Sequence, residues 1–148
     1  MNELKLTVAQ QVANAARQFQ QQNTGHAPKA VTVVLSNDTL VVTLHDALSP
    51  AERKLSRTSE GASQVQEFHR QLFKASIETL RSEIRRITGI AVREAAAEIE
   101  PVSGTIVHAF TNGDMVQVFQ LAHGMSQESW NSVPSRVQSE EGDALLAL

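Results

Sequence analysis

The sequence predicts an α+β fold, an antiparallel sheet of four to five strands with helices packed on one face. Two observations lead to this prediction. Apolar residues recur every three or four positions within residues 4–22 and again within 63–88, which is the spacing of amphipathic helices. Short runs of β-branched residues, separated by turn-forming residues, follow these segments, which is typical of antiparallel hairpins. The expected order of elements is α-ββ-αα-β-ββ.

The first expected helix, residues 4–22, has a narrow apolar stripe and a glutamine-rich opposite side, so it should bury one face and present a neutral polar one. Gly25 suits the left-handed conformation that ends many helices. The stripe consists of Val8, Val12, Ala16 and Phe19. The glutamines are Gln10, Gln11, Gln18, Gln20, Gln21 and Gln22.

The next segment predicts a β-hairpin. Two β-branched runs, residues 31–35 and 40–44, are separated by Ser36-Asn37-Asp38-Thr39, whose Asn and Asp favour turns. The short turn requires antiparallel pairing. Alternate residues of both runs should form one buried face. These residues are Val31, Val33, Leu35, Leu40, Val42 and Leu44.

A helix start follows at Ser49, Pro50 and Glu52. The side chains of Ser49 and Glu52 can each accept a bond from the other's backbone amide, as in a capping box, and proline is tolerated at the first helical position. We expect this helix to pause at residues 57–62 and a long amphipathic helix to run through 63–88. Its expected apolar face is Val65, Phe68, Leu72, Phe73, Ile77, Leu80, Ile84 and Ile87.

The segment at residues 90–99 is ambiguous, because its alanines favour helix whereas its flanking glycine and proline suit a strand. We expect a strand. Residues 105–110 and 115–121 predict a second hairpin across Asn112-Gly113, since Asn-Gly is a strong turn signal. Both faces of the last strand look partly apolar.

Length and composition fit one globular domain. The chain has 148 residues, of which 41% are hydrophobic and 20% charged. We expect a single domain at residues 1–123 and a flexible tail at 124–148, which is polar and rich in serine. The lack of cysteine excludes disulfides, thiolate catalysis and cysteine-ligated zinc. No apolar run approaches the ~20 residues of a membrane span. The N-terminus lacks the apolar segment of a signal peptide, so we expect a cytoplasmic protein.

No catalytic, metal or cofactor site is predicted. The five histidines form no close-spaced ligand pair, and phosphate-binding glycine loops and a nucleophile elbow are absent. Surface or half-buried positions are the expected places of these histidines. Three acids, Glu94, Glu98 and Glu100, would share one side of a strand, which is typical of a solvated edge.

The one candidate binding site is a basic stripe on the polar side of the long helix. It consists of Arg70, Lys74, Arg81 and Arg85. One interpretation is contact with an anionic surface: nucleic acid, lipid headgroups or an acidic partner. The other, which we favour, is a solvated helix face balanced by Glu67 and Glu78. A net charge of −3 also argues against nucleic acid. So does the lack of the GxxG loop that a KH-type module needs between its paired helices.

Three segments resemble a known family. They are Gly25-His26-Ala27-Pro28, Leu48-Ser49-Pro50-Ala51-Glu52-Arg53-Lys54-Leu55 and Ile87-Thr88-Gly89-Ile90-Ala91-Val92. With the Gln-rich helix and the hairpin, they make residues 4–121 similar to the MpsC-like family. These are small bacterial domains long classed as of unknown function, and they are named after a component of a sodium-translocating, membrane-potential-generating system. The resemblance implies a bacterial cytoplasmic protein with an accessory role near membrane ion or inorganic-carbon transport. It brings no catalytic residues.

We therefore expect a non-enzymatic accessory or regulatory domain that forms a homo-oligomer and binds a protein partner, such as a membrane transport component. Exposed strand edges and the two-sided apolar last strand motivate the oligomer. The alternative is a binding module for nucleic acid or an anionic membrane surface, which would use the basic stripe. An enzyme is the third hypothesis, and it would need a cleft with a strongly perturbed carboxylate or histidine.

Overall fold

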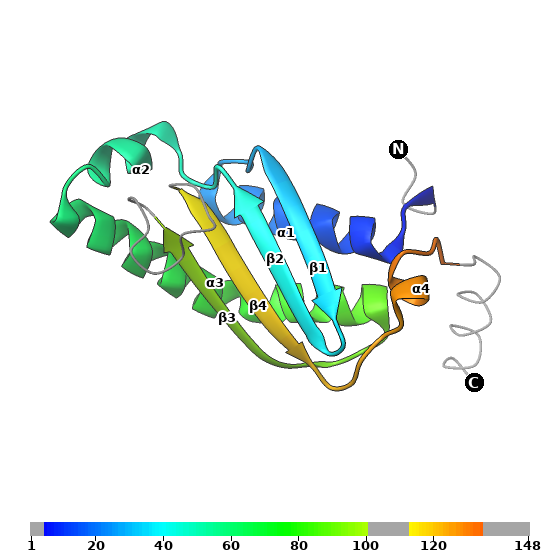
Figure 1. The fold of residues 1–148 in the computed structure, drawn as a ribbon. Coiled ribbons are helices and arrows are strands. Elements are labelled where there is room, and N and C mark those ends of the chain that lie inside the picture. The colour runs from blue at the N-terminus through cyan, green and yellow to red at the C-terminus, as the bar shows by residue number, and fades with distance from the viewer. Residues whose placement is uncertain (1–4, 101–112, 135–148) are drawn as a thin grey trace.

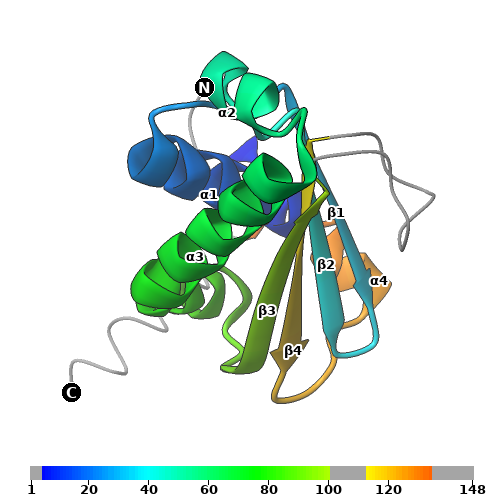
Figure 2. The same ribbon diagram turned by 90° about the vertical axis from the view of Figure 1, so that its left-hand side faces the viewer.

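The computed structural model describes residues 5–100 and 113–134 (Figure 1). Its elements, in chain order, are α1 (Val8–Thr24), β1 (Ala30–Ser36), β2 (Thr39–His45), α2 (Pro50–Leu55), α3 (Ser59–Thr88), β3 (Val92–Glu100), β4 (Asp114–Leu121) and α4 (Gln127–Trp130). The four strands form one antiparallel sheet in the order β1-β2-β4-β3. α1 and α3 cover one face of this sheet, and the described helices leave the opposite face open (Figure 2). The predicted α+β fold with helices on one face is confirmed.

α1 follows its predicted pattern. Thr7 and Gln10 form a capping box at its start, and Gly25, with a φ of 77°, ends it in the left-handed conformation. The predicted apolar stripe is buried. Two of the glutamines expected on the polar side, Gln11 and Gln20, are buried as well. The reason is that α1 contacts both the sheet and α3, so it buries more than one narrow stripe.

The predicted hairpin is present, with Ser36 opposite Thr39 next to its two-residue turn. Asn37 adopts a φ of 56° in that turn, a conformation that asparagine tolerates better than most residues. The face predicted to be buried does point toward the helices. Its members on β2 are fully buried, whereas Val31 and Val33 on the edge strand β1 are only partly buried.

The long helix begins at Ser59, earlier than predicted. Thr58 caps it, because its hydroxyl accepts a hydrogen bond from the Gly61 amide at 3.0 Å. Gly61 lies where α2 comes closest, and a Cβ there would clash with the carbonyl oxygen of Leu55. The missing side chain lets α2 and α3 meet in a tight junction instead of the longer pause predicted for residues 57–62.

The prediction that Phe68 lies in the core is wrong. Its side chain is 49% exposed, and the next residue, His69, is 2% exposed. Glu52 of α2 bonds to His69 and keeps this side of α3 inward, which leaves Phe68 about 100° away around the helix. The other residues of the predicted apolar face are buried or partly buried.

The ambiguous segment after the long helix forms a strand, β3, as predicted. β4 pairs with β2 on one side and with β3 on the other. The partner expected for β4 from the turn signal, residues 105–110, lies outside the described residues. Among the described strands, the one beside β4 on this side is β3, which packs under α3.

Residues 124–134 are not the flexible tail that the sequence predicted. Ser126 caps α4, and Trp130 is buried in the core with 3% exposure. The carbonyl oxygen of Ser132 accepts a backbone bond from Val8, which ties the segment to the start of α1. One tryptophan buries enough apolar area to hold a short segment that has no periodicity. The remainder of the predicted tail, residues 135–148, lies outside the described residues.

Candidate functional site

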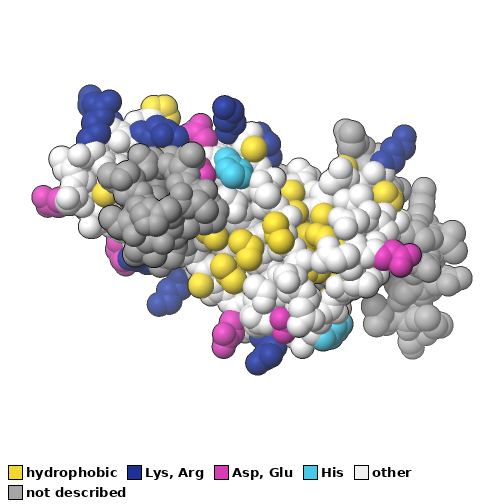
Figure 3. Space-filling model, in the orientation of Figure 1, with side chains coloured by type: hydrophobic (Ala, Val, Ile, Leu, Met, Phe, Trp, Pro, Cys, Tyr) yellow, Lys and Arg dark blue, Asp and Glu magenta, His cyan; other side chains and the backbone are white. Residues whose placement is uncertain are grey.

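The open face of the sheet carries a row of apolar side chains that crosses the strands (Figure 3). In the register, Val34 lies opposite Val41 and Val41 opposite Val118, and Ala96 continues the row on β3. Val34 is 53% exposed and Val118 is 38% exposed. An antiparallel sheet that meets water on one face ordinarily carries polar side chains there. This valine row is therefore a candidate contact surface.

The positions that flank the valine row on β1, β2 and β4 carry no charge. They are Thr32, Ser36, Thr39, Thr43, Val116 and Gln120. Hydroxyl and amide groups can hydrogen-bond to many partners, but they do not attract a charged one. A surface that fits this face is consequently apolar at its centre and without charge where it meets β1 and β2, whereas on β3 the exposed Glu94 lies beside the row.

One end of the open face is closed by a buried carboxylate. Asp114 is 3% exposed, and one of its oxygens accepts the backbone N–H of Asp46 at 3.0 Å. The other oxygen lies 3.4 Å from Nδ1 of His45, whose Nε2 is 2.9 Å from the Thr32 hydroxyl. Arg53 of α2 pairs with the Asp46 side chain. These contacts hold the β2–α2 junction against the start of β4.

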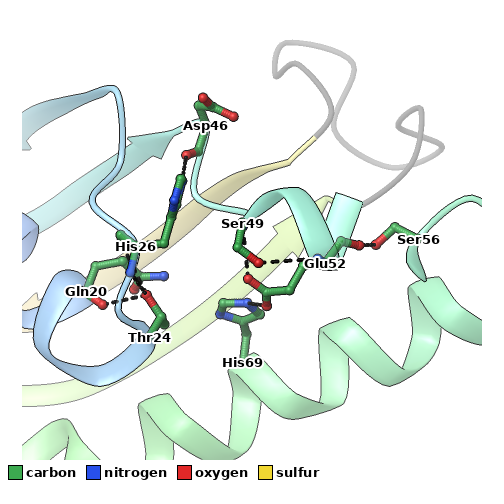
Figure 4. A network of polar contacts seen from close by, with 8 residues as sticks. All are labelled: Gln20, Thr24, His26, Asp46, Ser49, Glu52, Ser56 and His69. Carbon is green, nitrogen blue, oxygen red and sulfur yellow. Dashed lines mark hydrogen bonds and ion pairs between the residues drawn. The ribbon is translucent and has the colours of Figure 1, made fainter. Parts of the chain in front are cut away.

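A second polar network lies between α1, α2 and α3, under the same junction (Figure 4). Nε2 of the buried His69 lies 2.6 Å from Oε2 of Glu52, and Oε1 of Glu52 accepts the Ser49 amide at 3.0 Å. Burial by itself raises the pKa of Glu52. The hydrogen bonds from His69 and from the Ser49 amide outweigh burial, so this pKa lies below its usual value of 4.5. The pair fixes α2 to α3.

Three histidines that are far apart in the sequence come to this end of the molecule, a grouping that their spacing could not reveal. His45 and His69 have the partners described above, and Nε2 of His26 lies 3.0 Å from the Asp46 carbonyl oxygen. The cavity beside His69 measures about 10 Å³, room for about one water molecule. Among the described residues, no group of three or more His, Asp or Glu side chains is placed to hold a metal ion. The arrangement joins elements of the fold, and the cavity is too small for a substrate.

The structure divides the predicted basic stripe. Three of its members are exposed on α3: Arg70, Lys74 and Arg85. Arg81 instead turns toward the sheet, where its guanidinium group donates to the carbonyl oxygens of Val92 and Arg93. Its other terminal nitrogen lies 3.5 Å from Glu78. Arg81 therefore binds the backbone of β3. Binding of an anion by the three exposed residues stays a prediction.

The helices differ from membrane-spanning ones in their charge. α3 has 30 residues, but charged side chains recur along it. In the part of the chain that the structure describes, no helix combines the length and the apolar character that a membrane span requires.

Comparisons with known proteins agree with one another. A family model described as "Na+-translocating membrane potential-generating system (MpsC)" matches residues 5–113. The uncharacterized protein YbcI of Bacillus subtilis (strain 168) is 24% identical over 127 residues, which cover 86% of this chain and 95% of that protein. No solved structure matches. The range matched by the family model includes α1, α2, α3 and the first three strands, and with them Val34 and Val41 of the valine row.

Proposed function

Because the chain belongs to the MpsC family, we propose that it serves a Na⁺-translocating, membrane-potential-generating system as a non-enzymatic accessory domain. In this proposal it acts from the cytoplasm, through contact with a protein component of that system. The family description supplies the system. The exposed valine row on the open face of the sheet is the observation that supports contact as the mode of action.

The chemistry of the open face defines the partner surface. Covering Val34 and Val118 would remove apolar area from water, which is worth about 25 cal/mol for each Å² buried. The uncharged flanking positions favour a partner surface that is apolar at its centre. Such binding should depend little on salt, whereas binding through the exposed arginines of α3 to a polyanion would weaken steeply as salt rises.

A charge placed on the valine row should abolish the contact. In a host strain that lacks the protein, we expect the wild type to restore the membrane potential, measured with a potential-sensitive dye, and Val118→Lys to fail. The lysine would bring a charged group into an apolar contact, and burying it there costs binding free energy. Leu55→Lys is the matched control, because Leu55 is 49% exposed on α2, away from this face. It should restore the potential as the wild type does.

Full restoration by a folded Val118→Lys variant would refute the role of the open face. A double variant, Lys74→Glu with Arg85→Glu, tests the basic stripe in the same strain. Its failure beside an active Val118→Lys variant would point to an anionic surface as the target instead.

A further inference from the structure

The edge of the sheet at β1 offers backbone hydrogen-bonding groups to a further strand. Successive residues of an antiparallel strand turn their N–H and C=O groups to opposite sides. The Leu121 amide donates to the carbonyl oxygen of Asp38, which directs the even-numbered residues of β2 toward β4. The odd-numbered residues of β2 then pair with the even-numbered residues of β1. The backbone groups of Val31, Val33 and Leu35 therefore point out of the sheet.

α4 closes only one end of this edge. Nε2 of Gln127 donates to the carbonyl oxygen of Leu35, which agrees with the outward direction just derived. Within the described residues, no hydrogen bond reaches the outward backbone groups of Val31 or Val33. These two residues each keep one donor and one acceptor for a further strand.

A groove of about 540 Å³ runs beside this part of the edge, between α1 and Val31 of β1. An unpaired strand edge next to a groove is the arrangement to which an extended segment can be added as another strand. The α1 side of the groove is formed mainly by Gln10, Ala13, Asn14, Arg17 and Gln18.

The chemistry of the groove favours a second copy of this chain. In a two-fold symmetric interface each surface meets itself, so like charges repel whereas groups that both donate and accept can pair with their own kind. The side-chain amides of Asn14 and Gln18 are such groups. Gln10 keeps the N–H donors of its amide, whose oxygen accepts the Thr7 backbone N–H. Arg17 is the sole charged residue in the 17 residues of α1. An antiparallel strand edge is likewise complementary to a copy of itself.

We propose that two copies of this protein pair through their β1 edges, antiparallel, with Val31 of one copy hydrogen-bonded to the partner's Val33. This register follows from the groups available, since the Leu35 carbonyl oxygen is already occupied by Gln127. It places Thr32 opposite the partner's Thr32, with the two-fold axis between them. The two four-stranded sheets then form one continuous sheet. The two α1 helices lie next to each other over the junction.

The paired sheet has a consequence for the open face. A two-fold axis that relates antiparallel edge strands runs perpendicular to the sheet, so it keeps the same face on the same side. Both valine rows then face one direction and form a single, wider contact surface. The dimer stands independently of the proposed function, because it uses the edge of the sheet and not its open face.

A single cysteine tests the register, because the chain contains none of its own. Thr32 would lie opposite the partner's Thr32 in a non-hydrogen-bonded pair, with Cα atoms about 4.5 Å apart. That distance suits a disulfide. Thr32→Cys should form a covalent dimer under mild oxidation, read on a non-reducing gel. Val34→Cys is the matched control on the same strand and face. Its Cα would lie about 14 Å from its mate, so it should stay monomeric on the gel.

A second variant tests the hydrogen bonds themselves. Val33→Pro removes an outward N–H without touching the bonds between β1 and β2, and an edge strand tolerates proline at such a position. Sedimentation at tens of micromolar should show a dimer for the wild type and a monomer for Val33→Pro. Val33→Ala shortens the same side chain but keeps the N–H, so it should remain a dimer.

Each negative result is decisive. A wild-type protein that sediments as a monomer at these concentrations overturns the proposal, and leaves an extended segment of another protein as the occupant of the groove. A dimer in which Thr32→Cys cross-links no faster than Val34→Cys overturns it too, because the copies then meet elsewhere. The cysteine variants keep the proposal testable even if Val33→Pro does not fold.

Discussion

The two edges of the sheet differ in how far side chains protect them. At β3, Arg81 donates to two backbone carbonyl oxygens, and the exposed Arg93 and Glu94 lie at a shift in the register. Charged side chains and bulges are known devices that stop a strand edge from pairing. Farther along β3, the outward backbone groups of Ala95 and Ala97 have no hydrogen bond from the described residues, as is true of Val31 and Val33 at β1. β1 differs in having neither a charged residue nor a shift in its register.

The two edges differ because a different helix covers each edge strand. α3 lies over β3 and supplies the arginine that protects its edge. α1 lies over β1 and presents amides to the adjoining groove, with Arg17 as the one charge there. Protection of β3 is thus confined to one end of the strand, and the edge without such protection adjoins the more neutral helix.

The largest effect should come from opening the closed end of the β1 edge. Trp130 is buried and holds α4, whose Gln127 covers the Leu35 carbonyl oxygen. Trp130→Ala should lower the free energy of unfolding by about 3 kcal/mol, measured by urea denaturation, because it leaves a large cavity. It should also free the Leu35 carbonyl oxygen, which lengthens the accessible part of the β1 edge.

Val133→Ala is the control for Trp130→Ala, since Val133 is 48% exposed in the same segment. It should change stability by less than about 0.5 kcal/mol. Equal effects of the two substitutions would mean that residues 124–134 are held by their backbone and not by the tryptophan.

Removing the protection of the β3 edge should have a smaller effect on stability and a visible one on association. Arg81→Ala should cost about 1–2 kcal/mol, because two carbonyl oxygens lose a charged donor. It should also raise light scattering on concentration, since more of the β3 edge becomes able to pair. Arg85→Ala, an exposed site on the same helix, should do neither. If Arg81→Ala stays as well dispersed as the wild type, the bulge and the charges of β3 are sufficient protection.

The parts of this contrast that depend on local chemistry could be predicted from the sequence. The hairpin turn at Asn37 and the capping box of Ser49 and Glu52 each depend on residues a few positions apart, and both are present. The valine row follows from the alternation within the hairpin, because the buried face leaves Val34 and Val41 on the other side.

The parts that depend on how elements cross could not be predicted. Its position on the helix puts Arg81 in the basic stripe. Its guanidinium group nevertheless donates to the backbone of β3, at Val92, which lies 11 residues later in the chain. Phe68 and His69 exchange their expected places because Glu52 bonds to the histidine from another helix. Trp130 stands in a polar segment without periodicity, and only its contact with the core shows what it does.

The smallest expected effect concerns how stability depends on pH on the two sides of the molecule. On the α3 side, Glu52 faces His69 and Ser49, and its pKa lies below 4.5, so the ionised carboxylate stabilises the folded state above that pH. This contribution is lost as the pH falls through the lowered pKa. In the β1 groove, the amides of Gln10 and Asn14 do not titrate.

Stability measured by urea denaturation between pH 3 and pH 7 should therefore fall more steeply on acidification in the wild type than in Glu52→Gln. The effect is small because burial of the carboxylate offsets much of what its hydrogen bonds contribute. Parallel curves for the two proteins would show that the Glu52–His69 pair does not sense pH in this range.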